Sequence, residues 1–325
     1  MRIVLCYQTE DRHLRRIASV APEAEIINAS QQSIPEDIML ADVFCGHAKE
    51  RPVPWDRVAA QGRLKWIQSS AAGMDHCLAP EVIRSPILVT SASGLFADQV
   101  AEQTLALLLG LLRSLPVFFR AAQRKEFVRR PTRDLHETTV GIIGFGGNGR
   151  RLAELLAPYR TRILATDCFP VDRPPYVRQL LPPEGLHQVV KQADIVILCV
   201  PLTDQTRGMI DRATLETMKP GATLINVARG PVVVEDALVD ALESGHLSGA
   251  GLDVTEIEPL PPSSRLWDLP NVIITPHVGA QSRRRFDDAT DLFCDNLSRY
   301  LKGQPLRNVI DKELGFPPRR SPASR

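Results

Sequence analysis

The sequence lacks several features that mark common classes of protein. Its 39 Lys and Arg residues balance 38 Asp and Glu residues, which leaves a formal net charge of only +1. Without an excess of one sign, the chain has no electrostatic footprint for nucleic acid or for an anionic membrane surface. The longest apolar run, LALLLGLL at 105–112, is far shorter than the roughly 20 residues that span a bilayer. We therefore expect neither nucleic acid nor membrane among its partners.

Paired cysteine motifs are also absent. The sequence has no CxxC pair, and its cysteines are scattered as Cys6, Cys45, Cys77, Cys168, Cys199 and Cys294. Such a pattern fits buried thiols in a reducing compartment and argues against disulfides or a zinc site, so we expect no metal. The start, MRIVLCYQTEDRH, has only a short apolar run followed by charges, unlike a signal peptide. These observations predict a cytoplasmic protein.

Short apolar segments alternate with helical patterns, which predicts parallel α/β sheets. The chain has 325 residues, a length that favours two domains. In the first hundred residues the expected strands are RIVLC (2–6), DVFC (42–45), KWIQ (65–68) and ILVT (87–90). A second series begins near residue 138, with the expected strands TVGIIG (139–144), RILATD (162–167), DIVILCV (194–200), TLINVA (223–228), GAGLDV (249–254) and NVIIT (271–275).

Helical patterns lie between these strands. The segment at 97–115 is apolar nearly all round, so we expect a buried helix that Pro116 interrupts or kinks. The other predicted helices are GNGRRLAELLAP (147–158), EGLHQVVKQA (184–193), DRATLETM (211–218), VEDALVDALESG (234–245) and residues 283–302. The tail GFPPRRSPASR (315–325) is rich in proline, arginine and serine, and we expect it to be disordered.

The run GFGGNG at 144–149 has the glycine spacing of a dinucleotide-binding loop. It follows an apolar strand and opens an apolar-periodic helix, which is the context that the spacing needs. Gly144 permits a tight turn, Gly146 lets the backbone approach a pyrophosphate, and Gly149 lets the helix pack closely on the strand. The N–H groups and the dipole at the start of that helix favour phosphate. A glycine-rich turn without a cofactor is the alternative interpretation.

Asp167 ends the next expected strand, 23 positions after Gly144. A carboxylate at that place can accept hydrogen bonds from the adenosine ribose diol of NAD. No arginine follows it directly, so a 2′-phosphate would meet a carboxylate unless Arg173 folds back. We therefore predict NAD as the cofactor. Asn148 is unusual, because such helices often carry an inward-packing aliphatic residue there.

Reduction of a 2-keto acid needs a cation for the substrate carboxylate and ketone, an acid, and a group that keeps the acid charged. Candidates at expected strand ends are Arg229 in INVARG, Glu258 in GLDVTEIEPLP and His277 in NVIITPHVGAQS. Ligands bind at that edge of open α/β sheets. From spacing alone, Glu256 competes with Glu258, Arg229 could be a solvated arginine, and His277 could be a structural histidine.

With these residues in place, the chain resembles the D-isomer-specific 2-hydroxyacid dehydrogenases over nearly its full length. The resemblance is carried by the fingerprint with Asp167 and by SSAAGMD (69–75), ADQVAEQTLALLLGLLR (97–113), VPLTDQTRGMI (200–210), INVARG (225–230), GLDVTEIEPLP (251–261) and TPHVGAQS (275–282). It implies that Arg229 binds the substrate carboxylate and ketone, that His277 is the acid and base, and that Glu258 is the partner of His277. Thr255 departs from the family, which often has an aromatic residue there.

The resemblance also implies the remaining binding residues. Asp253 would bind the nicotinamide amide, and the backbone N–H groups of Gly73 and Met74 would bind the substrate carboxylate. Further residues implied for cofactor binding are Gly147, Asn148, Pro201, Thr206, Val227, Ala228 and Gly279, together with Arg229 and His277 themselves.

The family's fold and assembly give further expectations. The implied fold class is α/β, with two doubly wound parallel-sheet domains and a Rossmann-type cofactor domain inserted in a discontinuous flavodoxin-like substrate domain. The substrate domain would comprise residues 1–97 and 286–325, and the NAD-binding domain residues 98–285. The family commonly forms homodimers, so a homodimer is expected.

The predicted activity is NADH-dependent reduction of a 2-keto acid to a D-2-hydroxy acid, and the reverse. One alternative is an NAD-sensing interaction protein like the family's transcriptional corepressors, which keep the catalytic residues. A formate dehydrogenase is the other, and Glu258 argues against it because that subgroup has glutamine at this place. The sequence leaves the substrate open among glyoxylate, hydroxypyruvate, pyruvate, a phosphorylated hydroxy acid and a branched keto acid.

Overall fold

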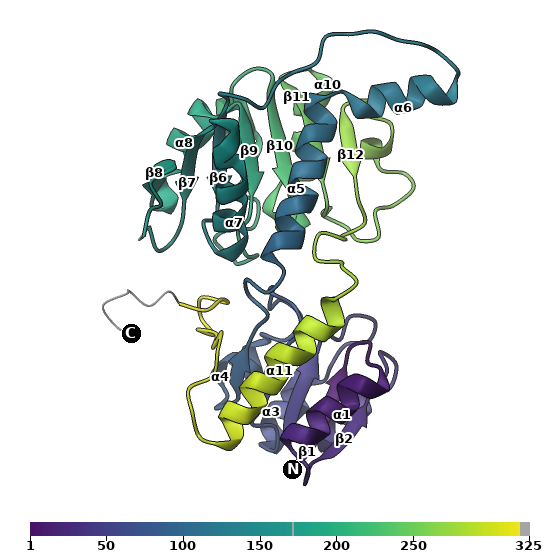
Figure 1. Ribbon diagram of the computed structural model, residues 1–325, viewed down its shortest axis with the longest axis vertical. Coiled ribbons are helices and arrows are strands. Elements are labelled where there is room, and N and C mark those ends of the chain that lie inside the picture. Colours follow the sequence, from purple (N-terminus) through teal and green to yellow (C-terminus); the bar gives the residue numbers. More distant parts are fainter. Residues whose placement is uncertain (171, 319–325) are drawn as a thin grey trace. The chain divides into compact units, whose positions relative to one another are not determined.

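The computed structural model describes residues 1–170 and 172–318. It divides into two compact units: Met1–Phe96 with Ser282–Arg325 form unit 1, and Ala97–Gln281 form unit 2. Each unit is an α/β domain with one parallel sheet (Figure 1). The sequence placed the domain boundaries at 97/98 and 285/286, and the substrate and cofactor roles given to the two domains stay predictions. From residue 319 on, the tail expected to be disordered lies outside the described residues.

Unit 1 contains a five-stranded sheet in the order β2-β1-β3-β4-β5, the doubly wound order of flavodoxin-like domains. Its strands are β1 (Arg2–Cys6), β2 (Glu25–Asn28), β3 (Val43–Gly46), β4 (Trp66–Ser69) and β5 (Leu88–Thr90), all paired in parallel. Its helices are α1 (Asp11–Val20), α2 (Ile34–Asp37), α3 (Trp55–Gln61), α4 (Pro80–Arg84) and α11 (Arg285–Leu301), with the short turn η1 (Ile38–Leu40).

Both faces of this sheet are covered, which explains why its central strands read as unbroken apolar runs. On one face, Val4 and Phe44 pack with Trp55 of α3 and with side chains of α2 and α4. On the other face, Trp66 packs with Phe293 of α11, next to residues of α1. Alternation along each strand sends neighbouring residues into these two separate cores.

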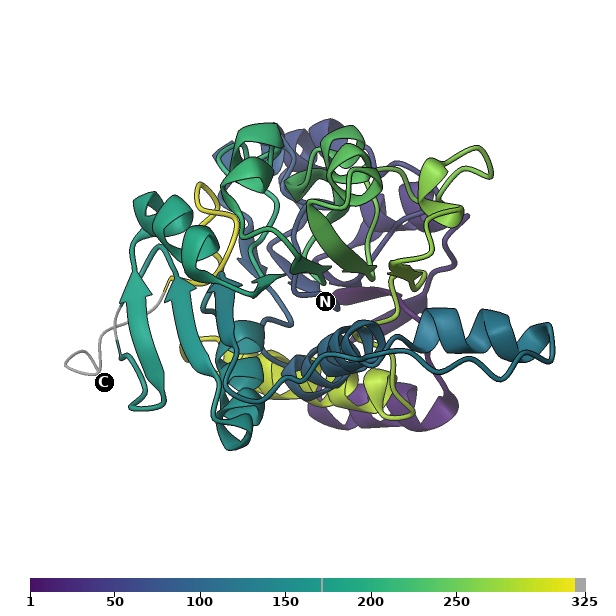
Figure 2. The same ribbon diagram turned by 90° about the horizontal axis from the view of Figure 1, so that it is seen from above.

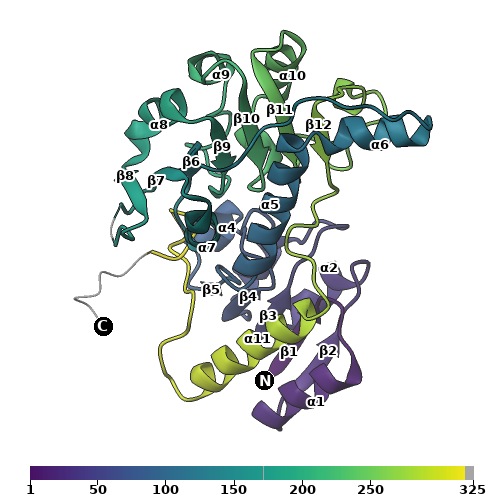
Figure 3. The same cartoon turned by 45° about the horizontal axis from the view of Figure 1, so that its top comes forward.

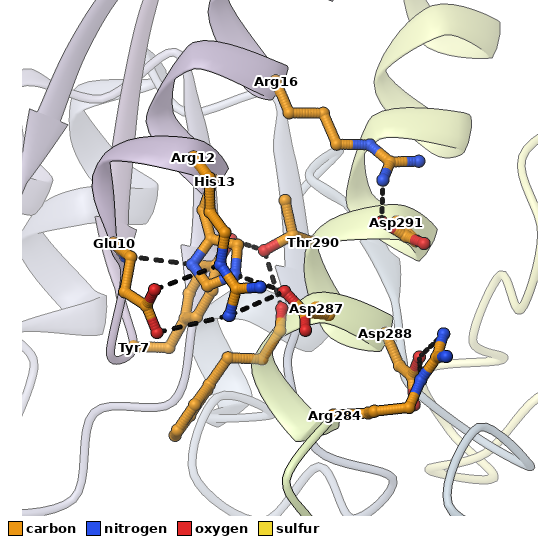
Figure 4. Close-up of polar contacts among 11 residues, drawn as sticks. Tyr7, Glu10, Arg12, His13, Arg16, Arg284, Asp287, Asp288, Thr290 and Asp291 are labelled. Atoms are coloured by element: carbon orange, nitrogen blue, oxygen red, sulfur yellow. Dashed lines mark hydrogen bonds and ion pairs between the residues drawn. The ribbon is translucent and has the colours of Figure 1, made fainter.

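Polar contacts also join α1 to the first turns of α11 (Figure 4). His13, which is 3% exposed, accepts a hydrogen bond at Nδ1 from the Glu10 N–H, and its Nε2 lies 2.8 Å from Asp287 Oδ1. Because Nδ1 accepts, the neutral ring carries its proton on Nε2 and donates it to Asp287. That hydrogen bond, reinforced by Arg12, holds the pKa of Asp287 below its usual value. The contacts fix the start of α11 against α1.

Unit 2 contains a seven-stranded sheet in the order β12-β11-β10-β9-β6-β7-β8. The strands are β6 (Thr139–Ile143), β7 (Arg162–Thr166), β8 (Val177–Leu181), β9 (Ile195–Leu198), β10 (Ala222–Asn226), β11 (Leu247–Leu252) and β12 (Val272–Ile274), again all in parallel. Seen from β6, the chain winds first to one side and then to the other, as in Rossmann-type domains. The two sheets confirm the predicted fold class.

Helices cover both faces of this second sheet (Figure 3). On one face lie α5 (Ala97–Leu112) and α7 (Gly147–Leu156), whose leucines pack on Val140 and Ile142 of β6. The other face packs against α8 (Leu186–Gln192), α9 (Arg212–Thr217) and α10 (Glu235–Glu243). Short 3₁₀ turns are η2 (Ala157–Tyr159), η3 (Pro183–Gly185), η4 (Gly230–Val232) and η5 (Arg265–Trp267).

Two strands were missed by the sequence patterns, and each lies at an edge of its sheet. Strand β2 (EIIN) has no fully buried residue, and β8 (VRQLL) has one. An edge strand has one covered flank only, so its sequence needs no continuous apolar run. The patterns that reveal central strands are therefore weak at both positions.

The apolar segment at 97–115 divides into two helices. Helix α5 ends at Leu112, Ser114 adopts a left-handed φ of 56°, and α6 (Leu115–Gln123) begins with Pro116 in its first turn. The two helices meet at 68°. Proline is favoured in a first helical turn, where its missing N–H costs nothing. The predicted interruption at Pro116 is thus confirmed.

Helix α6 extends away from the rest of unit 2, and the chain returns beside it (Figure 2). This segment exposes Phe119 (63%) and Phe127 (91%). Within the described residues, no single helix is long and apolar enough to cross a membrane, and α5 with α6 meets that criterion only as a bent pair.

Candidate active site

The glycine run turns the chain sharply from β6 into α7. Gly144 has a left-handed φ of 95°, and a Cβ atom there would lie 2.7 Å from the Cys199 carbonyl carbon. A Cβ at Gly149 would lie 2.2 Å from the Gly144 oxygen, so the helix packs closer to the turn than any side chain allows. At Gly146, the N-cap of α7, a Cβ would meet nothing within 4 Å. The loop is closed on its inner side and open at Gly146.

Open space at a helix N-terminus fits a dinucleotide pyrophosphate, because the first N–H groups of the helix have no partner within it. Gly147 and Asn148 form the first turn of α7, with Gly147 exposed and Asn148 half-buried. Residues of the glycine run therefore leave the space that the predicted cofactor requires.

Asp167 directly follows β7 and is tied to the glycine loop. Its Oδ2 accepts a hydrogen bond from the Phe145 N–H, and its Oδ1 accepts one from the Phe169 N–H, both at 2.8 Å. Arg173 donates to the Val177 carbonyl at the start of β8. Val177 pairs with Ile163, so this contact lies at the amino ends of the parallel strands, whereas Asp167 lies at their carboxyl ends. Arg173 therefore does not fold back on Asp167.

Arg229 lies in a tight turn after β10. A Cβ at the next residue, Gly230, would lie 1.8 Å from the Thr255 carbonyl oxygen, so this turn packs directly on the chain that follows β11. Asn226, 1% exposed, organises the turn: its amide donates to the Arg229 carbonyl at 3.1 Å and accepts from the Ala228 N–H at 3.0 Å. The Arg229 guanidinium donates to the Ala228 carbonyl at 2.8 Å. These contacts restrict the direction of the Arg229 side chain.

His277 and Glu258 form a hydrogen-bonded pair. The distance from His277 Nδ1 to Glu258 Oε2 is 2.8 Å, and Glu258 Oε1 accepts from the Thr255 N–H at 3.3 Å. Glu256, the competing carboxylate, accepts from the Glu235 N–H instead. A carboxylate at Nδ1 leaves Nε2 of the imidazole as the atom for proton transfer. The geometry thus pairs the histidine with Glu258 rather than with Glu256.

Asp253 orders the segment that carries His277. Its carboxylate, 3% exposed, accepts hydrogen bonds from the Thr275 hydroxyl at 2.7 Å and from the N–H groups of Val278 and Gly279 at 3.0 and 2.8 Å. The Asp253 carbonyl also accepts the His277 N–H at 2.8 Å. Buried carboxylates need such donors. Asp253 therefore supports the left-handed backbone of His277, whose φ is 55°.

The other predicted residues lie at the same edge of the unit 2 sheet or in unit 1. After β9, the Thr206 hydroxyl donates to the Pro201 carbonyl at 2.7 Å. Val227, half-buried, and Ala228, buried, follow β10. The substrate residues predicted at the SSAAGMD motif belong to unit 1 and follow β4: Gly73 is half-buried, and the Met74 carbonyl accepts the N–H groups of Cys77 and Leu78. Roles for all of these residues stay proposals.

The family model for the NAD-binding domain of D-isomer-specific 2-hydroxyacid dehydrogenases matches residues 105–279. A glyoxylate reductase from Thermofilum pendens is 35% identical over 266 residues, which cover 78% of this chain and 77% of that protein. The chain belongs to the D-isomer-specific 2-hydroxyacid dehydrogenases.

Solved structures of related dehydrogenases agree with this assignment. A family member from Xanthobacter autotrophicus, in complex with NADPH and MES, has a TM-score of 0.81 at 28% identity, covering 97% of this chain and 99% of that one. An NADPH-dependent glyoxylate/hydroxypyruvate reductase from Sinorhizobium meliloti, in complex with NADP and sulfate, has a TM-score of 0.81 at 26% identity with the same coverage.

Three residues of this dehydrogenase support the site but escaped the sequence analysis. Asn226 fixes the Arg229 turn, Thr275 binds the Asp253 carboxylate, and Gln103 of α5 donates to the Thr275 hydroxyl at 2.9 Å. Asn226 is the second residue of the INVARG motif, and Thr275 is the first residue of the TPHVGAQS motif. Their places in these motifs could have marked both as site residues. Gln103 also stands inside a quoted motif, ADQVAEQTLALLLGLLR, but the apolar pattern of that segment predicted only a buried helix.

Proposed function

We propose that this dehydrogenase reduces a small 2-keto acid to a D-2-hydroxy acid with NADH, and catalyses the reverse reaction. The observation that carries the proposal is the 2.8 Å contact between His277 Nδ1 and Glu258 Oε2, in a loop against which the Arg229 turn packs. A histidine held by a carboxylate can act as acid and base. An arginine in a turn that packs on the same loop can bind a carboxylate and a ketone oxygen together.

The chain's residues divide the reaction between them. NADH, when bound at the glycine loop, supplies the hydride to C2 of the keto acid. Arg229 holds the substrate carboxylate and polarises the ketone. His277 gives its Nε2 proton to the alkoxide oxygen, so one proton is consumed for each keto acid reduced. Asp253 keeps the histidine segment in place and would meet the nicotinamide amide.

Relatives suggest where to look for the substrate. The Thermofilum pendens relative is a glyoxylate reductase, and the Sinorhizobium meliloti neighbour acts on glyoxylate and hydroxypyruvate. We propose these two acids as the first substrates. A panel that adds pyruvate and a branched keto acid, followed by loss of NADH absorbance, tests the proposal. A phosphorylated hydroxy acid is tested in the reverse direction, by the gain of NADH absorbance from NAD. An absence of turnover with every acid would favour a corepressor-like interaction protein instead.

NADH is expected to outperform NADPH with the best keto acid. The Asp167 carboxylate would repel an adenosine 2′-phosphate, and Arg173 is engaged at the opposite edge of the sheet. Two structurally similar dehydrogenases were solved with NADPH or NADP bound, so a preference for NADH would distinguish this chain from them. We expect kcat/KM for NADH to exceed that for NADPH by about 10-fold, the scale of one lost charge-assisted hydrogen bond. Equal values for both cofactors would contradict the role given to Asp167.

Glu258→Gln is expected to lower kcat for keto acid reduction by about 10-fold. Glutamine keeps the shape of Glu258 but replaces the charged acceptor at His277 Nδ1 with a neutral one, which forms a weaker hydrogen bond and holds the imidazole less firmly. Steady-state kinetics with saturating NADH measures the change. Glu256→Gln is the matched control and should keep the wild-type kcat, because Glu256 accepts from the Glu235 N–H instead. A fall in kcat in Glu256→Gln alone would contradict the role given to Glu258.

We also propose that the enzyme is a cytoplasmic homodimer that pairs through α6 and the chain that returns beside it. The support is the exposure of Phe119 and Phe127, because large exposed aromatic side chains mark protein interfaces. Sedimentation equilibrium of the wild type should give the mass of a dimer. A double variant, Phe119→Asp with Phe127→Asp, should give a monomer, and a monomeric wild type would rule the proposal out.

A further inference from the structure

Arg150 shares a neighbour, Phe145, with Asp167, the residue proposed to select the cofactor. It belongs to the first turns of α7, and its guanidinium carbon is 4.8 Å from the centroid of the Phe145 ring. The same Phe145 donates its N–H to Asp167 Oδ2. Phe145 therefore contacts both residues: its backbone N–H binds the Asp167 carboxylate, and its ring packs against the Arg150 guanidinium.

The position of the guanidinium is well defined. Phe145 is 0% exposed, so the ring beneath Arg150 is fixed by the core. Arg150 Nη1 also donates to the Asp172 carbonyl at 2.8 Å, in the loop that follows Asp167. The chain turns back at Asp172, which has a left-handed φ of 54°. Arg150 thus joins α7 to the loop after β7, on which the adenosine ribose would rest.

Cofactor choice at this place depends on what the 2′ position meets. A carboxylate accepts hydrogen bonds from a 2′-hydroxyl and repels a 2′-phosphate, whereas an arginine binds a 2′-phosphate. A guanidinium has five N–H donors in a planar fork, so it can hold a loop and bind a phosphate at once. Asp167 and Arg150 both contact Phe145, and they favour opposite groups at the 2′ position.

We propose that Arg150 is a specificity-determining residue for the cofactor, able to bind an adenosine 2′-phosphate, and that the charge of Asp167 opposes this binding in the wild type. The proposal rests on the proposed nicotinamide cofactor site. It implies that cofactor preference depends on a balance between two residues. Removal of the Asp167 charge alone should then admit the phosphorylated cofactor, without any added arginine.

Adenosine 2′,5′-bisphosphate and adenosine 5′-phosphate make a matched pair of probes, since they differ only by the 2′-phosphate. Their affinities are measured by calorimetry, which needs no substrate turnover. The wild type should bind adenosine 5′-phosphate more tightly than the bisphosphate. Asp167→Ser should raise the ratio of bisphosphate to monophosphate affinity by about 10-fold, the scale of a hydrogen bond to a charged group. Keto acid turnover is followed separately, so failure of the proposed activity would not be mistaken for failure of this proposal.

Arg150 is then changed in the Asp167→Ser background. Arg150→Ala should remove the gain in the affinity ratio, and Arg150→Lys should retain part of it as a point charge. The matched control is Arg162→Ala in the same background, because Arg162 starts β7 and contacts Gln192 at the other edge of the sheet. A purely structural role for Arg150 would weaken both probes equally and leave the ratio unchanged. An unchanged ratio in Asp167→Ser, or an equal ratio with and without Arg150, would overturn the proposal.

Discussion

Replacement of His277 by alanine is expected to lower kcat for keto acid reduction by about 10²–10⁴, the usual contribution of a general acid. In this dehydrogenase, His277 is the imidazole that hydrogen-bonds to Glu258, and alanine leaves the alkoxide without a proton donor. NADH affinity should fall far less than kcat, since the glycine loop and Asp167 keep most of the contacts implied for the cofactor. Single-turnover kinetics with saturating NADH measures the chemical step directly.

His187→Ala serves as the control for the loss of a histidine, because His187 is exposed on α8. Its kcat should match that of the wild type. If His277→Ala keeps more than about a tenth of the wild-type kcat, the size of the loss falls below that of general acid catalysis, and His277 is not the proton donor.

Arg229→Lys is expected to lower kcat/KM for the keto acid by about 10²–10³, as for the loss of a donor to a developing oxyanion. A planar guanidinium binds carboxylate and ketone together, whereas an ammonium is a point charge. The guanidinium of Arg229 also donates to the Ala228 carbonyl, a contact that restricts the direction of the side chain. NADH titration by fluorescence should show a far smaller loss of cofactor affinity than the loss in kcat/KM.

Arg212→Lys is the matched control, since Arg212 is exposed and pairs with Asp240 on α10. Exposed pairs of this kind contribute little, so its kinetics should resemble those of the wild type. Wild-type kcat/KM in Arg229→Lys would show that Arg229 does not bind the substrate.

The central strands could be predicted from the sequence because parallel strands covered on both faces leave continuous apolar runs. Segments such as TVGII and IVIL are buried at nearly every position. Strands β2 and β8 could not, since EIIN and VRQLL keep polar and exposed residues. The other two edge strands, β5 and β12, keep apolar runs and were predicted. Burial, rather than strand propensity, was the signal that the sequence patterns detected.

The sequence predicted the three proposed catalytic residues of the candidate site, but not the residues that hold them in place. Motif spacing located Arg229, Glu258 and His277, but the histidine's partner depends on how the chain turns after β11. Asn226 and Gln103 bind backbone or side-chain groups that only the folded turn brings within reach. Such contacts leave no periodic pattern, because they depend on three-dimensional turns rather than on spacing along the chain.

The place of α11 in the chain has a consequence for synthesis. Trp66 of β4 packs against Phe293 and Tyr300 of α11, with ring centroids 5.5 and 5.2 Å apart. The whole of unit 2 is encoded between them. A ribosome therefore releases the first 96 residues long before the helix that covers one face of their sheet exists. Unit 2, continuous in sequence, can complete its core first, while nascent unit 1 keeps an apolar face exposed and open to chaperones or aggregation.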